Sequence, residues 1–332
     1  MNVQEVEKLP FDLKRIFSIH SEEEFIHLSL QVFHFQYANN PVYKKFVDLI
    51  GVPPSEVKTV EQIPFLPISF FKTHTVKSTN TLTEKVFYSS GTTGQTRSKH
   101  HIADLSLYEL SFLKGFEHFY GHLENYLILG LLPAYHENEH SSLIYMVDHL
   151  MQWTKYKESS FLLNDYERLL SLVERYKGNR KILLIGVSYA LLDLSEKYKV
   201  DLSDCIVMET GGMKGRRTEL TKETLHQELK EGFGLDQIHS EYGMTELLSQ
   251  AYSKEDQLFF TPPWMKVLIR QHNDPFQMIE HKSGGINVID LANIYSCSFI
   301  ATQDLGKTHS GGFEVLGRFD HSDIRGCNLL IQ

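Results

Sequence analysis

The stretch Lys181–Val187, KILLIGV, is an apolar run that begins with one charge and ends before a serine. Two similar runs lie on either side of it in the chain, YLILGLL at residues 126–132 and CIVMETGG at residues 205–212. Each has the length of a strand, and the lack of polar alternation indicates burial on both faces. Such strands are typical of a mostly parallel sheet with helices on both sides.

Helical patterns with clear start signals alternate with these runs. Asp104, Asn164 and Thr221 precede amphipathic segments and are expected to cap them, because their side-chain oxygens can accept from free backbone amides of the first turn. The three segments are residues 105–119, 166–176 and 222–234. The alternation of strands and helices predicts an α/β fold.

The N-terminal residues are also expected to be helical. Ser21 and Glu24 form a capping box before an apolar pattern, and the helix should end at Asn40. Pro41 can begin the next helix, which Gly51 closes.

The pattern changes at about Trp264. Short strand-like runs with turn residues between them follow, at residues 265–270, 284–290, 297–304 and 312–318. We therefore expect an α/β core at residues 1–262, a β-rich subdomain at 263–318 and a hinge-like tail at 319–332.

Composition excludes several classes of protein. Of 332 residues, 42% are hydrophobic and 23% are charged, which is typical of a soluble globular protein. Lys and Arg number 33 and Asp and Glu 42, so the formal charge of -9 argues against nucleic acid and anionic membranes as partners. The three cysteines are widely spaced and there is no apolar signal segment, which favours a reducing, cytoplasmic compartment.

The segment Tyr88–His100, YSSGTTGQTRSKH, is rich in hydroxyls and in backbone amides that glycine leaves accessible. Such a loop suits a polyphosphate, although it does not match the Walker A pattern, and a solvated turn would have the same composition. Its candidate ligand-binding residues are Ser89, Ser90, Gly91, Thr92, Thr93 and Gly94.

A second segment makes the interpretation of the hydroxyl-rich segment more specific. YGMTE, beginning at Tyr242, follows SSGTTG after about 150 residues, and DLG at 304–306 and GRFDHSDIRG at 317–326 come later. Together these motifs resemble the adenylate-forming superfamily, which includes acyl-CoA synthetases and peptide-synthetase adenylation domains. The resemblance implies the N-terminal domain fold of those enzymes, with mixed and parallel sheets, flanking helices and a β-rich subdomain.

The resemblance also implies roles for individual residues. Glu246 would hold Mg²⁺ and Thr245 would bind the α-phosphate of ATP, since adenylation needs charge neutralised at the reacting phosphorus. Tyr242 would stack on adenine, with Gly243 beside it and Gly211 and Gly212 on the other side of the base. Asp304 would accept from the ribose hydroxyls, and Arg318 would reach the ribose or phosphate. The superfamily loop usually carries a lysine after its last glycine, and here either Arg97 or Lys99 would replace it.

Within the superfamily, the chain resembles the short LuxE-type acyl-protein synthetases, which lack the mobile C-terminal domain. LLPAYHENEHSSLIYMVDHL at 131–150, METGGMKGR at 208–216 and DIRGCNLL at 323–330 carry this likeness. It implies activation of a carboxylic acid, expected to be fatty or aryl, to acyl-AMP. Cys327 would then receive the acyl group as a thioester and pass it to an acceptor protein such as an acyl reductase or carrier.

Three alternatives remain from the sequence. A phenylacetate-type acyl-CoA ligase would share the nucleotide residues, and an ATP-independent acyltransferase would explain the lack of a C-terminal catalytic lysine. HENEH, His136–His140, matches the HExxH pattern of zinc peptidases, but Pro133 and the polar middle pair argue against a helix there. We expect a polar loop instead, in which His140 or Ser142 could contact the substrate carboxylate.

Other candidate residues have structural explanations. His100 and His101 are expected at the surface, whereas Phe112, Phe116 and Tyr120, at helical spacing, are expected in the core. Cys205 and Cys297 are interpreted as small packing residues.

Overall fold

The computed structural model describes residue 9 and residues 11–78, 82–90, 96–198, 200–211 and 220–319. The chain divides into two compact units. Residues 82–262 form the continuous unit, and residues 1–81 with 263–332 form the discontinuous unit. This division groups residues 1–81 with the β-rich segment, whereas the sequence led us to place them with residues 82–262.

The continuous unit contains a sheet in the order β5-β4-β6-β7-β8-β9. Neighbouring strands from β5 to β8 pair in parallel, and β9 is antiparallel to β8. Every residue of β4 is buried, which confirms the strand type predicted from its apolar run. The strands are β4 (Tyr126–Leu131), β5 (Ser160–Phe161), β6 (Lys181–Val187), β7 (Cys205–Thr210), β8 (His239–Tyr242) and β9 (Ala251–Ser253).

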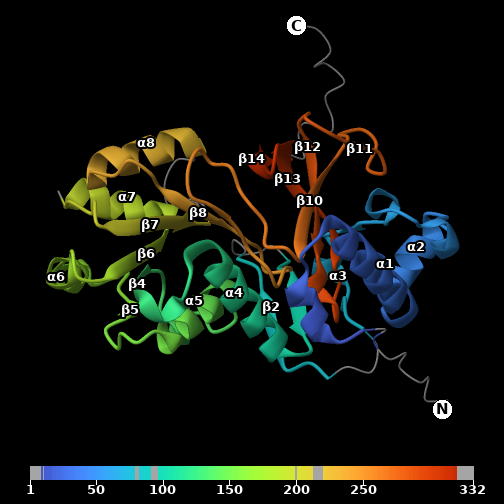
Figure 1. The fold of residues 1–332 in the computed structure, drawn as a ribbon, viewed down its shortest axis with the longest axis horizontal. Coiled ribbons are helices and arrows are strands. Elements are labelled where there is room, and N and C mark those ends of the chain that lie inside the picture. The colour runs from blue at the N-terminus through green and yellow to red at the C-terminus, as the bar shows by residue number, and fades with distance from the viewer. Residues whose placement is uncertain are drawn as a thin grey trace, which may run out of the picture. The chain divides into compact units, whose positions relative to one another are not determined.

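Helices cover both faces of this sheet. In Figure 1, α7 and α8 lie on one face, and α4 and α5 lie on the other. The predicted core residues Phe112, Phe116 and Tyr120 are buried on α4, as expected. The helices are α4 (Leu105–Tyr120), α5 (Ser142–Trp153), α6 (Tyr166–Tyr176), α7 (Ser188–Lys197) and α8 (Lys222–Phe233).

The caps of these helices follow the sequence in two of three cases. The side chain of Asp104 accepts from the amide of Leu107, and that of Thr221 accepts from Thr224, as predicted. The prediction of Asn164 as the cap of α6 is wrong. Asp165 takes this position, because a carboxylate directly before the first helical residue reaches the Arg168 amide at 3.1 Å.

The discontinuous unit combines residues from both sides of the continuous unit in sequence. Its sheet has the order β1-β13-β12-β10-β11, and β14 also pairs with β13. All pairs are antiparallel except β1 with β13, which confirms a mainly antiparallel C-terminal segment. The strands are β1 (Leu66–Pro67), β10 (Met265–Arg270), β11 (Met278–Ile279), β12 (Gly284–Asp290), β13 (Phe299–His309) and β14 (Gly312–Arg318).

The α-helices in the described part of this unit are α1 (Glu22–Asn39), α2 (Pro41–Leu49) and α3 (Phe70–Thr73). The Ser21 hydroxyl accepts from the Glu24 amide at 3.1 Å, as predicted, but the Glu24 carboxylate accepts from the His20 amide, so the full capping box is not formed. Helix α1 ends where it was predicted to end, and the Asn40 side chain also caps α2. Gly51 follows α2 with φ of 71°, a conformation that favours glycine. Among the described residues, no helix is both long and apolar enough to cross a lipid bilayer.

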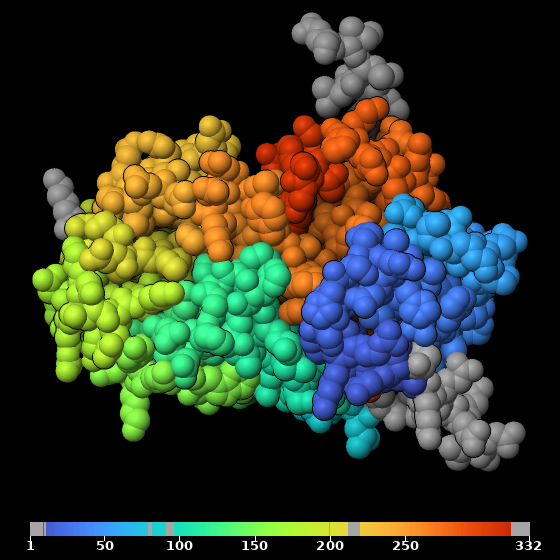
Figure 2. Space-filling view, viewed as in Figure 1, coloured from blue at the N-terminus to red at the C-terminus, as the bar shows by residue number. Residues whose placement is uncertain are grey.

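A buried amide ties α1 to the C-terminal part of this unit. Gln36 is 0% exposed, and its Nε2 donates to the carbonyls of Asn293 and Ile294 at 3.1 and 2.8 Å. Its Oε1 accepts from the Ser298 amide at 3.0 Å. Figure 2 shows the blue N-terminal residues packed beside the orange and red C-terminal residues of the same unit.

Replacing Gln36 with leucine should lower the free energy of unfolding by about 2 kcal/mol, because buried backbone groups lose their partners. Urea unfolding followed by circular dichroism would measure the change. Gln31→Leu on the same helix is the matched control, since its buried Oε1 has no hydrogen-bond partner among the described residues. Equal effects of the two substitutions would contradict the assigned role of Gln36.

Two of the three cysteines are buried free thiols, Cys205 and Cys297. Burial raises the pKa of each thiol to about 12. Both are therefore unreactive packing residues near neutral pH, as the sequence predicted.

Candidate active site

Chemistry-bearing residues follow three neighbouring parallel strands of the continuous unit. Ser188 comes directly after β6, Gly211 directly after β7, and Tyr242 is the last residue of β8. Because the strands are parallel, their carboxyl ends lie at one edge of the sheet. This edge is where open α/β sheets bind their ligands.

The two described ends of the hydroxyl-rich segment continue into a two-stranded ribbon. β2 (Lys85–Tyr88) and β3 (Lys99–Ile102) pair in antiparallel fashion. The Tyr88 amide donates to the carbonyl of His140, which follows β4, at 2.9 Å. The imidazole Nδ1 of His100 hydrogen-bonds the Thr245 carbonyl at 2.7 Å. The ribbon therefore lies next to Thr245, although 145 residues separate His100 from Thr245 in the chain.

The prediction of His100 as a surface residue is wrong. Its ring is 0% exposed, and Nδ1 must carry the proton because a carbonyl oxygen can only accept. Its neighbour on the register, Phe87, is also fully buried. A polar pair such as HH gives no local sign that one imidazole is buried, because the partner carbonyl is 145 residues away.

Of the two cations proposed to replace the superfamily lysine, Arg97 lies beside the loop. Its Nε donates to the Ser89 carbonyl at 2.6 Å, and its guanidinium lies 5.5 Å from the centre of the Tyr88 ring. The Ser98 amide donates to the Ser89 hydroxyl at 2.9 Å, which fixes the start of the loop. Lys99 is exposed and sits opposite Tyr88 in the ribbon.

The residues expected around adenine lie at the ends of β7 and β8. Gly211 is exposed and has φ of 72°, so it allows a close approach that a larger residue would prevent. Tyr242 is buried, and its ring packs against Phe259 with centroids 5.9 Å apart. Gly243 is exposed, and a Cβ there would lie 2.4 Å from a carboxylate oxygen of Glu241.

Two buried carboxylates at this edge were not identified from the sequence. Glu209 on β7 is 0% exposed, and Lys222 Nζ lies 2.5 Å from its Oε1. Burial alone would raise the pKa of Glu209, but the charge of Lys222 and the hydrogen bonds around the carboxylate lower it to about 2. Burial raises the pKa of Glu241 on β8 to about 7, although the Thr210 hydroxyl donates to its Oε2 at 2.5 Å. The only sequence signal that these two acidic residues, in METGG and HSEYG, are buried is their position inside apolar strands.

The residues expected at the ribose lie in the discontinuous unit. Asp304 on β13 and Arg318 on β14 are register partners, and Arg318 Nε lies 3.2 Å from Asp304 Oδ1. The Asp304 side chain is 12% exposed and that of Arg318 is 85% exposed. The two residues thus form a salt bridge between neighbouring strands.

The HENEH segment does not form the helix that a zinc peptidase requires. Its first half is a short 3-10 turn, Tyr135–Glu137, and α5 begins only at Ser142. His140 is exposed, and its ring contacts Tyr88 with centroids 5.2 Å apart. Ser142 is buried, and its carbonyl accepts from the Tyr108 hydroxyl at 3.0 Å. Their expected contact with the substrate carboxylate stays a prediction.

Several candidate residues lie outside the described residues. These are Gly91, Thr92, Thr93, Gly94, Gly212 and Cys327. Ser90, Thr245 and Glu246 are described, and Glu246 is 5% exposed.

The donor set fits a metal that arrives with a nucleotide. Among the described residues, no three His, Cys, Asp or Glu side chains form a group that could hold a metal by themselves. Mg²⁺ commonly binds through one or two carboxylates together with substrate phosphates and water. Glu246 would supply the carboxylate, and Thr245, its neighbour in the chain, carries a hydroxyl that is a further oxygen donor.

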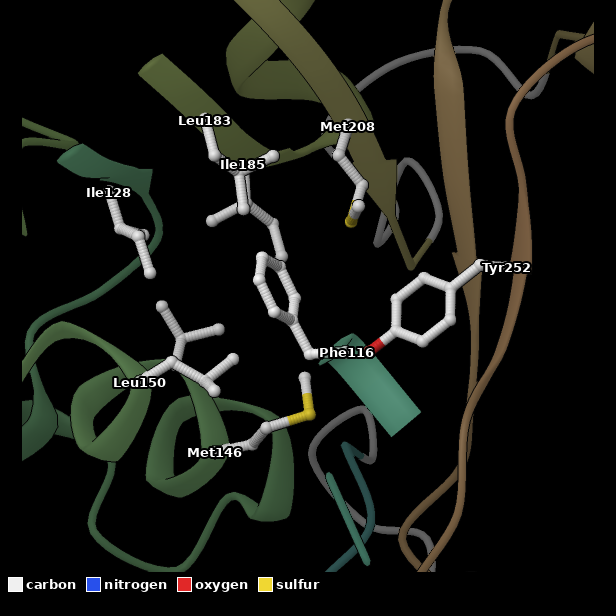
Figure 3. Close-up of a pocket in the computed structure, with 9 residues that line it drawn as sticks. Phe116, Ile128, Met146, Leu150, Leu183, Ile185, Met208 and Tyr252 are labelled. Carbon is white, nitrogen blue, oxygen red and sulfur yellow. The ribbon is translucent and has the colours of Figure 1, made fainter. Parts of the chain in front are cut away.

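An apolar cavity lies between the sheet of the continuous unit and the helices α4 and α5. Figure 3 shows side chains from both helices and from the strands directed toward this space. It admits about one water molecule in the present side-chain positions. Its lining comprises Phe116, Ile128, Met146, Val147, Leu150, Leu183, Ile185, Met208 and Tyr252.

No protein-family model matches the sequence, and the curated proteins contain no match. Solved structures do resemble the fold. Structures of 2-hydroxyisobutyryl-CoA ligase in the postadenylation state with R3-HIB-AMP, and in the thioesterification state with 2-HIB-AMP and CoA, have TM-scores of 0.66 and 0.65. They are 11% and 13% identical to this chain, cover 90% and 93% of it, and are themselves covered over 68% and 71% of their length.

ATP-bound MatB from Rhodopseudomonas palustris has a TM-score of 0.53 and is 16% identical over 70% of this chain. The chain spans about half the length of MatB, 47%. At such identities the likeness concerns the fold alone. The fold is that of the N-terminal domain of adenylate-forming enzymes, as the sequence motifs implied.

Proposed function

We propose that this protein uses ATP and Mg²⁺ to activate a carboxylic acid, and then transfers the acyl group to its own Cys327. In the first step a carboxylate oxygen forms a bond to the α-phosphorus, and the bond to the pyrophosphate leaving group breaks. In the second step the Cys327 thiolate attacks the acyl carbon and AMP leaves. The thioester would then supply an acceptor protein, such as an acyl reductase or carrier.

One observation carries the proposal. The ribbon that holds Ser89 is hydrogen-bonded to Thr245 through His100, at the edge where parallel strands end. A site formed by both segments would supply the oxygen donors and backbone amides that binding of a triphosphate requires. The sequence motifs and the fold of ATP-bound ligases support the same assignment.

Each residue then has a task. The loop from Ser89 to Gly94 would contact the phosphates, with Arg97 offsetting the charge that pyrophosphate carries away. Glu246 would hold Mg²⁺, which neutralises charge on the phosphates, and Thr245 would hydrogen-bond the α-phosphate. Adenine would lie between Tyr242 and the glycines 211 and 212, and Asp304 with Arg318 would bind the ribose.

The acid is proposed to be apolar, fatty or aryl. The cavity in Figure 3 has aliphatic and aromatic walls, and its lining residue Met146 lies one helix turn after Ser142, the first residue of α5. Because the cavity has room for only about one water molecule, a longer acyl group would have to displace flexible side chains such as Met146 and Met208.

Cys327→Ser tests the transfer step. With ATP, Mg²⁺ and radiolabelled acids, the wild type should acquire a label that hydroxylamine removes, and the variant should acquire none. Acid-dependent exchange of pyrophosphate into ATP should stay within about threefold of wild type, because the first step does not use the thiol. Cys205→Ala is the control, since this buried thiol should not carry the acyl group.

A second candidate is an acyl-CoA ligase, which the CoA-bound ligase structure of the same fold favours. In that case acid, ATP and CoA would yield a free thioester, and Cys327→Ser would leave its rate unchanged. An ATP-independent acyltransferase would show no pyrophosphate exchange with any acid. Label that persists in Cys327→Ser would reject Cys327 as the acceptor while leaving adenylation in place.

A further inference from the structure

The Lys222–Glu209 pair connects to both sides of the proposed adenine site. Lys222 is the first residue of α8, where a positive charge is disfavoured by the helix dipole. A residue that opposes its local preference usually has a tertiary role. Here Lys222 Nζ lies 2.5 Å from Oε1 of Glu209, which is 0% exposed.

The first connection runs through Glu209 to Gly211. Oε2 of Glu209 accepts from the Ser188 hydroxyl at 3.3 Å. The same hydroxyl lies 3.3 Å from the Gly211 carbonyl and can donate to it. The single hydroxyl proton of Ser188 is shared between these two acceptors, so the hydroxyl bridges the Glu209 carboxylate and the Gly211 backbone at the carboxyl ends of β6 and β7.

The second connection runs through Phe259 to Tyr242. The Lys222 ammonium lies 5.1 Å from the centre of the Phe259 ring, within the range of a cation–π contact. Phe259 is fully buried and packs edge-on against the Tyr242 ring at 5.9 Å. One ammonium therefore supports the glycine on one side and the aromatic ring on the other.

We propose that Lys222 is a positioning residue for the adenine base, through Glu209 and Ser188 to Gly211 and through Phe259 to Tyr242. The inference rests on the proposed function, because it assumes that adenine binds between Gly211 and Tyr242. Lys222 compensates the buried charge of Glu209, and the proposal assigns it no contact with the phosphates. Loss of Lys222 therefore lowers the affinity for ligands that contain the base and leaves the affinity for ligands that contain only phosphate unchanged.

The experiment measures binding of a fluorescent ATP analogue and the KM values of pyrophosphate exchange. Lys222→Met should lower the affinity for ATP and for AMP by about tenfold to a hundredfold. Inhibition by tripolyphosphate and the KM of the acid should stay within about twofold. Lys222→Arg should restore most of the ATP affinity, because it keeps the charge beside Glu209. Lys230→Met on the same helix is the matched control.

A second variant covers the case in which an unpaired buried carboxylate prevents folding. Glu209→Gln combined with Lys222→Met removes both charges, so the chain should fold while ATP affinity stays reduced. Unchanged ATP affinity in this double variant would overturn the inference. Equal losses for ATP, tripolyphosphate and acid would also overturn it, since they would show a general structural effect.

The wild type distinguishes this inference from the proposed function. A wild-type protein that binds no adenine nucleotide would refute both. A wild-type protein that binds ATP with the same affinity as Lys222→Met would refute the role of Lys222 alone.

Discussion

Replacing Glu246 with glutamine should lower the rate of acid-dependent pyrophosphate exchange by roughly a hundredfold to a thousandfold. Glutamine keeps the size of the buried side chain but loses the negative charge that would attract Mg²⁺. The phosphates would then enter the reaction with their charge less well compensated. Steady-state rates measured over a range of Mg²⁺ concentrations would show the loss.

The magnesium dependence separates a metal ligand from a packing residue. If Glu246 binds the ion, the variant should need more Mg²⁺ for half-maximal rate, while its thermal unfolding stays close to that of the wild type. Glu228→Gln on α8 serves as the control. An unchanged magnesium requirement, together with a lower melting temperature, would assign Glu246 a structural role instead.

The second large effect concerns Glu241 and the pH dependence of stability. The pKa of its carboxyl is about 7 in the folded protein, because burial disfavours the charge. In the unfolded chain it has the ordinary value of 4.5, so the folded state holds a proton that the unfolded state has lost between these values. The free energy of unfolding should therefore fall as pH rises from about 4.5 to about 7, by about 3 kcal/mol.

Glu241→Gln isolates this contribution. The amide oxygen still accepts from the Thr210 hydroxyl but carries no charge at any pH. At pH 8 we expect the free energy of unfolding of the variant to be about 3 kcal/mol higher than that of the wild type. At pH 4.5 we expect the two values to be about equal. Urea unfolding at the two pH values gives the comparison, and parallel pH profiles for the two proteins would contradict it. Glu209, whose pKa is lowered, is present in both proteins, so its contribution to the pH dependence cancels in the comparison.

Much of the fold could be predicted from local patterns. Apolar runs marked β4, β6 and β7, and Ser21, Asp104 and Thr221 marked helix starts, because both signals act within a few residues. The grouping of residues 1–81 with the C-terminal strands could not be read in this way. It depends on contacts such as Gln36 with Asn293, 257 residues apart, which no local pattern encodes.

The candidate site was predictable in part for the same reason. Glycines and hydroxyls at 89–94 and the YGMTE segment could be recognised from residue type and order, whereas the buried positions of His100, Glu209 and Lys222 arise from tertiary packing. A lysine at a helix start was the one available signal for the last of these. Arg97 became the better candidate than Lys99 only through its contact with the Ser89 carbonyl.

The discontinuous unit has a consequence for biosynthesis. Residues 82–262 must be translated before β13 can pair with β1, the N-terminal strand of the same sheet. At ordinary synthesis rates this delay is on the order of 10–40 s. During that time α1 can pack against α2 but lacks its contacts with Asn293, Ile294 and Ser298, so we expect nascent chains to expose this side of α1 to chaperones while the continuous unit already folds on the ribosome.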